Sequence, residues 1–105
     1  MKVFISQPMS GRTDAEIIAI REKLFDEYKA ENPDASLVDA YADVMSHMGE
    51  YYTYEHPPIA MLAESLMCLA DSDLVIMAPR WENHRGCQVE HQVAKYYDIP
   101  IKYAR

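Results

Sequence analysis

Short apolar runs alternate with segments of helical character along this chain, and this alternation constrains its fold more than any other feature. The apolar runs cover residues 2–6, 36–39, 73–78 and 99–103, and each has the length of a single strand. Strands that alternate with helices through short connections form a parallel sheet with right-handed crossovers. The order therefore predicts a flavodoxin-like (Rossmann-like) α/β fold, in which a parallel sheet of four to five strands is flanked by helices.

Three of the intervening segments carry helix signals. A capping box at Thr13–Glu16 opens the first helix, which ends before Pro33. A pair of prolines opens a second helix, over 58–71, since proline is tolerated in the first helical turn. A third helix is predicted over 87–97. Residues 40–57 show no regular pattern, and we expect them to be irregular.

Composition limits what the chain can do. Its 105 residues suffice for a single domain, 1–105, with one core. The net charge of −7 argues against binding to a nucleic-acid polymer, because phosphate backbones need a basic surface. No apolar run is long enough for a membrane span or a signal peptide. Cys68 and Cys87 are too far apart for a metal motif. We expect a cytoplasmic domain without membrane contact, metal or cofactor.

Glu90 is the first candidate for a functional residue. It follows the apolar run 73–78 and the loop containing Gly86, and it lies one turn into the third predicted helix. On a helical wheel Glu90 lies in the middle of the arc formed by Val89, Val93, Ala94, Tyr96 and Tyr97. A carboxylate facing a core is costly unless it is paired, hydrogen-bonded or used. Open α/β sheets bind ligands at this edge. Glu90 can instead cap a backbone group or pair with a nearby arginine.

The loop after the first strand is a second candidate binding element. It precedes a helix N-terminus and offers hydroxyls, an amide and backbone donors, from Ser6, Gln7, Ser10, Gly11 and Arg12. Such a loop can cradle a ribose or a phosphate. It is not a G-x-G-x-x-G loop, so the dinucleotide fingerprint is absent. A polar turn with no ligand explains the same residues about equally well.

Three stretches, at residues 3–12, 70–79 and 81–94, carry a resemblance to a known family. Together they resemble a small, poorly characterised DUF4406-like branch, found in phages and bacteria, of the nucleoside 2-deoxyribosyltransferase-like superfamily. The resemblance covers nearly the whole chain. Its most specific part is the pattern Gly-x-x-x-Glu-x-x-x-Ala over 86–94. In the studied enzymes the matching glutamate attacks the anomeric carbon of deoxyribose, so the resemblance gives Glu90 that role.

The chain departs from those enzymes around the nucleophile. They carry an aspartate two residues before the glycine, where this chain has His84. The small neighbour after the glycine is Cys87 here. An acid on the preceding helix corresponds roughly to Ser65, and a tyrosine of the first strand to Phe4. The nucleophile is therefore kept while its partners are replaced.

The remaining candidates have roles that follow from their chemistry. His84 or Asn83 can donate to a leaving base. Arg12 or Arg85 can hold a 5′-phosphate through charge-assisted hydrogen bonds. Trp81 can stack on a base. Gly86 permits close approach of a ligand to the backbone, and Cys87 at a helix N-terminus is a binding residue or an alternative nucleophile. Each of them is also compatible with a surface or packing role.

These observations support three hypotheses of different classes. The first is N-glycosidic cleavage or 2-deoxyribosyl transfer on a nucleoside or nucleotide, with Glu90 as nucleophile. The second is a non-catalytic nucleotide sensor or sequestering module that kept the pocket. The third is an interaction protein that uses the aromatic segment 41–56. We also expect a homo-oligomer, because helix 58–71 is apolar nearly all round, with Met61, Met67 and Cys68 off its main stripe.

Overall fold

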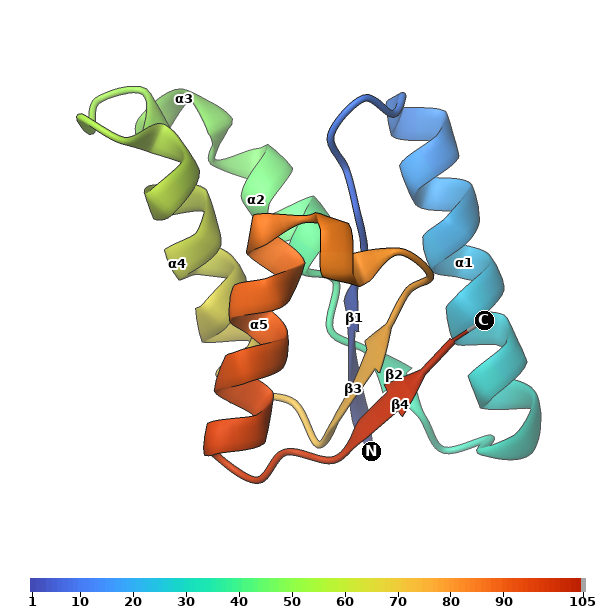
Figure 1. Ribbon diagram of the computed structural model, residues 1–105. Helices are drawn as coiled ribbons and strands as arrows, with labels where there is room; N and C mark the ends of the chain where they lie inside the picture. The colour runs from blue at the N-terminus through green and yellow to red at the C-terminus, as the bar shows by residue number, and fades with distance from the viewer. Residues whose placement is uncertain (105) are drawn as a thin grey trace.

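Four parallel strands form one sheet in the order β2-β1-β3-β4. They are β1 (Lys2–Ser6), β2 (Ser36–Leu37), β3 (Leu74–Met77) and β4 (Ile101–Tyr103). The computed structural model describes residues 1–104, and Figure 1 shows the sheet between two layers of helices. The structure confirms the predicted flavodoxin-like α/β fold, with four strands in the described residues.

The helices are α1 (Asp14–Glu31), α2 (Ala40–Ser46), α3 (Met48–Tyr51), α4 (Pro57–Ala70), the 3-10 helix η1 (Trp81–Asn83) and α5 (Arg85–Tyr96). The three predicted ones, α1, α4 and α5, begin and end close to the predicted positions. The predicted capping box is present, since the Thr13 hydroxyl accepts from the Glu16 amide at 3.2 Å and the Glu16 carboxylate accepts from the Thr13 amide at 3.0 Å. The C-terminal strand begins two residues later than predicted, after Pro100.

The core consists of two clusters on opposite faces of the sheet. Val3 and Ile5 belong to the cluster that contains Leu24 of α1, and Phe4 belongs to the cluster that contains Leu69 of α4 and Ala94 of α5. This alternation is the ordinary period of a strand, and it puts the next side chain, Ser6, on the same face as Phe4. The end of β1 therefore presents a hydroxyl to the layer that contains α5.

The chain order produces a switch point at the middle of the sheet. From β1 the chain passes through α1 to the outer strand β2 and then returns to place β3 on the other side of β1. The helix layers change face at the same place (Figure 1). Loops leaving β1 and β3 therefore diverge at their carboxyl ends and leave a crevice between them.

The prediction that residues 40–57 are irregular was wrong, because α2 and α3 form there. Asp39 caps α2 by accepting from the Ala42 amide at 3.1 Å. Both helices pack against α4, and Tyr41 and Tyr51 are buried. Tertiary packing decides the structure of so short a segment more than its local pattern does. One consequence is that part of the second apolar face of α4 is covered within the chain.

The predicted apolar arc of the last helix also needs correction. Tyr96 and Tyr97 are 73% and 76% exposed, and Val89 is exposed as well. The residues that α5 buries are Cys87, Glu90 and Ala94, which are spaced by three and four positions. One helix packed on one sheet buries only a narrow stripe, so the wide arc drawn from the sequence was too generous.

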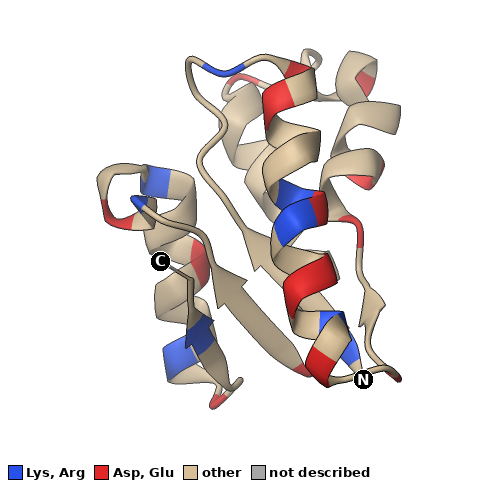
Figure 2. Ribbon diagram, turned by 90° about the vertical axis from the view of Figure 1, so that its right-hand side faces the viewer, with Lys and Arg blue, Asp and Glu red and all other residues tan. Residues whose placement is uncertain are grey.

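Charged residues lie mainly on the helices and loops, where basic and acidic positions are interspersed (Figure 2). Strand β3 carries no charge at all. Within residues 1–104, no helix combines the length and the apolar character that crossing a membrane would require.

Candidate functional site

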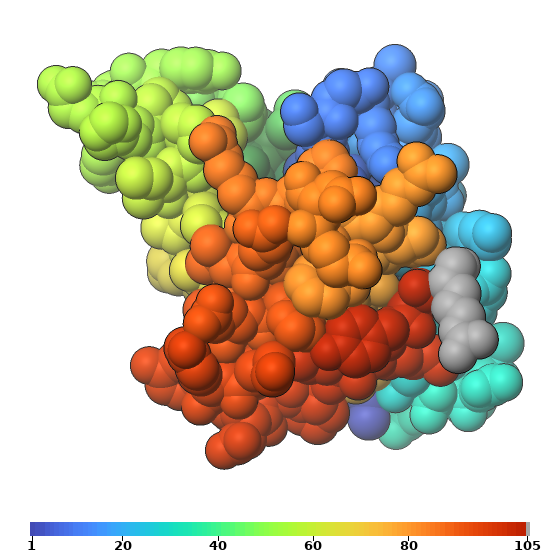
Figure 3. Space-filling view, in the orientation of Figure 1, coloured from blue at the N-terminus to red at the C-terminus, as the bar shows by residue number. Residues whose placement is uncertain are grey.

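A cleft of about 280 Å³ lies at the carboxyl ends of β1 and β3, where the switch point predicts a ligand site. In the space-filling view of Figure 3 the surface is hollowed between α3 and α4 on one side and the loop after β1 on the other. Its lining comes from five parts of the chain: Ile5, Gln7, Met9, Ser10, Arg21, Ala40, Tyr41, Val44, Pro58, Met61, Leu62, Ser65, His84, Arg85, Gly86, Cys87 and Glu90.

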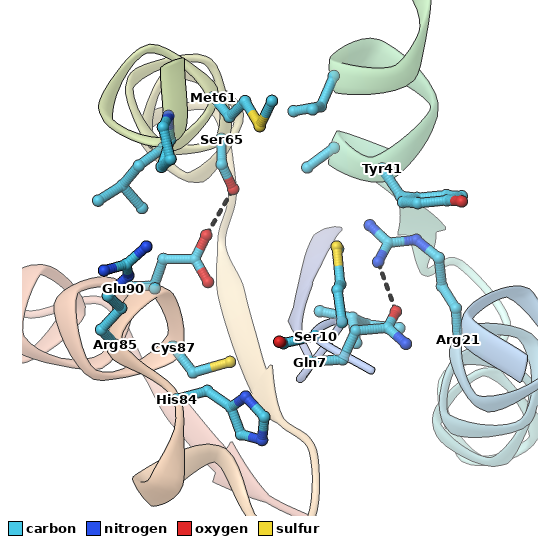
Figure 4. Close-up of a pocket in the computed structure, with 17 residues that line it drawn as sticks. Gln7, Ser10, Arg21, Tyr41, Met61, Ser65, His84, Arg85, Cys87 and Glu90 are labelled. Atoms are coloured by element: carbon cyan, nitrogen blue, oxygen red, sulfur yellow. Dashed lines mark hydrogen bonds between the residues drawn. The ribbon is translucent and has the colours of Figure 1, made fainter. Parts of the chain in front are cut away.

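Glu90 lies on one wall of this cleft, with only 7% of its surface exposed. Its Oε1 accepts a hydrogen bond from the Ser6 hydroxyl at 2.6 Å, and its Oε2 accepts one from the Ser65 hydroxyl at 2.5 Å. The two serines come from β1 and α4, so three elements converge on one carboxylate. Figure 4 shows the hydrogen bond from Ser65. The side chain is therefore held in one orientation by neutral donors.

Burial governs the electrostatics of this wall. It raises the pKa of Glu90 above its usual value, while the hydroxyls of Ser6 and Ser65 and the charge of Arg21 oppose that rise. Burial also raises the pKa of the Cys87 thiol to about 11. A thiol of that acidity stays protonated near neutral pH, which argues against Cys87 as the nucleophile.

Arg21 lies on the opposite wall, and Figure 4 shows its guanidinium across the cleft from Glu90. Its Nε donates to Asp39 at 3.1 Å and its Nη1 donates to the Gln7 side chain at 2.8 Å. Gln7 is itself held in place, because its Nε2 donates to the Ile17 carbonyl at 2.9 Å. The guanidinium is thus fixed by one carboxylate and one oriented amide.

The third nitrogen of Arg21 is different. Its Nη2 is buried and has no hydrogen-bond partner among the described residues, although the side chain is only 4% exposed. Burial lowers the pKa of Arg21, and the charge of Asp39, with a smaller contribution from Glu90, opposes that decrease. Buried polar nitrogens in folded proteins are nearly always hydrogen-bonded, so each exception needs an explanation.

Several of the residues predicted from the sequence meet in this cleft. Together with Glu90, the lining contains Gln7, Ser10, His84, Arg85, Gly86 and Cys87. Ser6 lies behind the lining, where it holds Glu90. The two loops that were singled out in the sequence therefore form one site.

Four other predicted binding residues lie elsewhere. Arg12 lines a separate depression, beside Lys23 and Arg80. The Trp81 ring stacks on His91 with ring centres 4.1 Å apart. Gly11 and Asn83 are exposed and do not line the cleft; Gly11 adopts a positive φ of 77°, which only glycine takes without strain.

Sequence reasoning missed the wall that carries Arg21. Arg21 lies between Ile17 and Leu24 on the buried stripe of α1, so the argument applied to Glu90 would have identified it. Tyr41 was missed because α2 was not predicted, and its hydroxyl donates to Asp14. Ser65 was noted only as the position of a replaced acid. Its contact with Glu90 depends on the packing of α4 against α5.

No cluster of three or more His, Cys, Asp or Glu side chains is arranged to hold a metal ion within residues 1–104. What the cleft offers is one buried carboxylate, one buried guanidinium, an imidazole and a largely apolar remainder. Such a site can bind a small, partly apolar molecule with a few polar groups.

Together the strand order and the helices on both faces of the sheet define an α/β protein of the flavodoxin-like class, with a cleft at the switch point. The family model described as "Domain of unknown function (DUF4406)" matches residues 1–103, and the chain belongs to this family. No curated protein and no solved structure matches the chain.

Proposed function

We propose that this protein cleaves the N-glycosidic bond of a nucleoside or nucleotide, by hydrolysis or by 2-deoxyribosyl transfer, with Glu90 as the nucleophile. One observation carries the proposal. Glu90 is buried in a cleft at the switch point, and both its oxygens are held by the neutral hydroxyls of Ser6 and Ser65. The resemblance to the nucleoside 2-deoxyribosyltransferase-like superfamily gives the same residue the same role.

The environment of Glu90 suits a nucleophile better than a structural ion. A carboxylate that only stabilised the fold would be expected to pair with a cation, because burying an unpaired charge is costly. Among the described residues, no Lys or Arg side chain donates to Glu90; both hydrogen bonds come from serines. The hydroxyls orient the carboxylate and leave its charge available to a reacting centre.

The reaction proceeds in two displacements. A Glu90 oxygen forms a bond to the anomeric carbon while the bond from that carbon to the base nitrogen breaks, and the electron pair stays on the base. Water or a second base then attacks the anomeric carbon and displaces the carboxylate. His84 lines the same cleft and is the group suited to exchange a proton with water or with a base.

The test is a panel of deoxynucleosides and their 5′-monophosphates, with released base measured by chromatography. Wild-type protein should release base from some members, and Glu90→Gln should reduce that rate at least a thousandfold. Glu22→Gln, the same change on the exposed side of α1, should leave the rate unchanged. Equal turnover by wild type and Glu90→Gln would exclude Glu90 as the nucleophile.

A non-catalytic nucleotide-binding module is the second candidate, and one observation favours it. The hydrogen-bond partners of Glu90 are hydroxyls, and among residues 1–104 no second carboxylate lines the cleft. Without a second acid, the proton transfer that usually assists departure of the base has fewer routes. Binding of panel members in calorimetry, with every member intact after long incubation, would favour the module over the enzyme.

A further inference from the structure

Arg21 carries a donor that nothing in the described residues uses, and this donor lies on the wall opposite Glu90. We propose that Arg21 Nη2 donates a hydrogen bond to a carbonyl oxygen of the substrate's base and stabilises that base as it leaves. The inference rests on the proposed function and names a feature of its substrate: a base with an exocyclic oxygen. It gives Arg21 a role in catalysis and in base selection.

The first argument is the cost of the unpaired nitrogen. Nε and Nη1 of Arg21 are occupied by Asp39 and Gln7, and Gln7 is fixed by the Ile17 carbonyl. Nη2 therefore cannot gain a partner by a small rotation without breaking one of these bonds. A buried donor without a hydrogen bond raises the free energy of the folded protein. A ligand acceptor that formed this bond would remove the cost. Because Arg21 lines the cleft, the ligand is the natural source of that acceptor.

The second argument is the direction of the displacement. A nucleophile attacks the anomeric carbon from the face opposite the departing group. With Glu90 on the wall formed by α4 and α5, the base must leave toward the other wall, where Arg21 and Tyr41 lie (Figure 4). Ser65 contacts Glu90 directly, and His84 directly precedes α5. Both lie on the nucleophile's side of the cleft.

The third argument favours a carbonyl oxygen over a phosphate as the acceptor for Arg21 Nη2. Arg21 already has a carboxylate partner in Asp39, and Glu90 adds a second acidic group to the same cleft. A phosphate dianion beside Arg21 would meet both of them. Much of the rest of the cleft lining is apolar, including Ala40, Tyr41 and Val44 of α2 and Met61 and Leu62 of α4. Apolar walls and one spare donor fit a flat heterocycle that carries an oxygen acceptor.

The chemistry follows from where charge develops. As the bond from carbon to nitrogen breaks, the electron pair moves onto the base and is shared with its carbonyl oxygen. A guanidinium N–H placed there stabilises this charge before any proton is transferred. The base anion then takes a proton from water, and a second water or an acceptor base releases the sugar from Glu90. Arg21 thus compensates for the two acids that Ser65 and His84 replace.

Two leaving groups test the role of Arg21. One substrate is an oxo-base nucleoside, 2′-deoxyinosine or 2′-deoxyuridine, and the other is 4-nitrophenyl 2-deoxyriboside, whose phenolate leaves readily without assistance. Arg21→Lys keeps a cation beside Asp39 but removes Nη2. It should lower kcat/KM by roughly a hundredfold on the oxo-base substrate, and by less than about threefold on the nitrophenyl substrate. An equal loss on both substrates would indicate a merely structural role and would overturn the proposal.

Arg80→Lys is the matched control, because Arg80 lines a different depression, and it should change neither rate. A measurement on unmodified protein covers the case in which Arg21→Lys does not fold. Wild type should bind hypoxanthine about tenfold more tightly than purine, or uracil more tightly than pyrimidine, in calorimetry. This preference can appear even if no nucleoside is cleaved, so the proposed function can fail separately. The absence of a preference in both pairs, or of all binding, overturns the Arg21 proposal.

Discussion

The two walls of the cleft each bury a charged side chain, but they stabilise it in different ways. Glu90 receives two hydrogen bonds from neutral hydroxyls and, within the described part of the chain, no direct ion pair. Arg21 has a carboxylate partner and an amide partner, and one of its nitrogens has none. On the first wall, both oxygens of Glu90 accept hydrogen bonds, but no directly paired cation among the described residues neutralises its charge. On the second wall, Asp39 neutralises the charge of Arg21, but one nitrogen of Arg21 lacks a hydrogen bond within residues 1–104.

This difference suggests what each wall does. A carboxylate without a cationic partner keeps its charge for a developing positive centre, such as the anomeric carbon in the transition state. A guanidinium already paired with Asp39 contributes its remaining donor rather than its net charge. Cleavage of an N-glycosidic bond separates charge in the same sense, positive on the sugar and negative on the base. The predictions below test each wall separately.

The largest expected effect is a change of oligomeric state through helix α4, which holds Glu90 by way of Ser65. Helix α4 supplies Ser65, and its outer side exposes Ile59 and Met67, the latter by 70%. We propose that a second copy of the chain covers this side, since closed symmetric dimers are the commonest assembly. Met67→Glu should then convert a dimer to a monomer in light scattering. A wild-type protein that is monomeric at high concentration would contradict this.

Substitution of Asp39 tests how much the ion pair with Arg21 stabilises the fold. It caps α2 and pairs with Arg21, so Asp39→Ala removes both interactions. Because Asp39 is half exposed, we expect the free energy of unfolding to fall by about 2 kcal/mol, about half of it from the lost cap. Asp39→Asn retains an oxygen for the cap and should lose about 1 kcal/mol. No loss in Asp39→Asn, measured by urea unfolding, would mean that the ion pair contributes nothing.

Glu90→Gln should stabilise the fold, by an amount that depends on pH. Burial raises the pKa of Glu90 in the folded state above its usual 4.5, so folding favours the protonated form. That stabilisation is present below the unfolded pKa and is lost as pH rises through the folded pKa. The variant should therefore match wild type near pH 4 and exceed it by about 1 kcal/mol near pH 8. If the melting temperatures of Glu90→Gln and wild type differ by the same amount at pH 4 and at pH 8, the claim that burial raises the pKa of Glu90 is contradicted.

The smallest effect concerns phosphate. Arg85 lines the cleft, whereas Arg12 lies in another depression. If the substrate is a 5′-monophosphate, Arg85→Gln should weaken its binding by about 1 kcal/mol, because Arg85 is exposed and its charge is screened. Arg12→Gln should have no effect. A loss with Arg12→Gln alone, measured by calorimetry, would assign the phosphate to the other depression.

Much of the fold was predictable because its signals are local. The apolar runs, the capping box at Thr13–Glu16 and the prolines that open α4 each fix an element within a few residues of its observed bounds. The helices α2 and α3 were not predictable in this way. They are short, and they form because Tyr41, Tyr51 and the cap at Asp39 pack them against α4.

The candidate site also has parts that local sequence signals predict and parts that depend on tertiary packing. The burial of Glu90 followed from its place on a helical wheel, and the same argument would have found Arg21 had it been applied to α1. The meeting of the two residues could not be predicted, because they come from helices on opposite faces of the sheet. Nor could the contact of Ser65 with Glu90 at 2.5 Å, which depends on the packing of α4 against α5.

The central claim is that Glu90 forms a covalent bond to the sugar, and intact-mass spectrometry tests it directly. A 2-fluoro-2-deoxy nucleoside slows release of the sugar, because fluorine destabilises the positive charge at the neighbouring carbon, so the intermediate should accumulate. We predict a mass increase of one fluorosugar on wild type, located on the α5 peptide that contains Glu90, and none on Glu90→Gln. Release of base by wild type with no adduct, or with the adduct on another residue, would contradict the account.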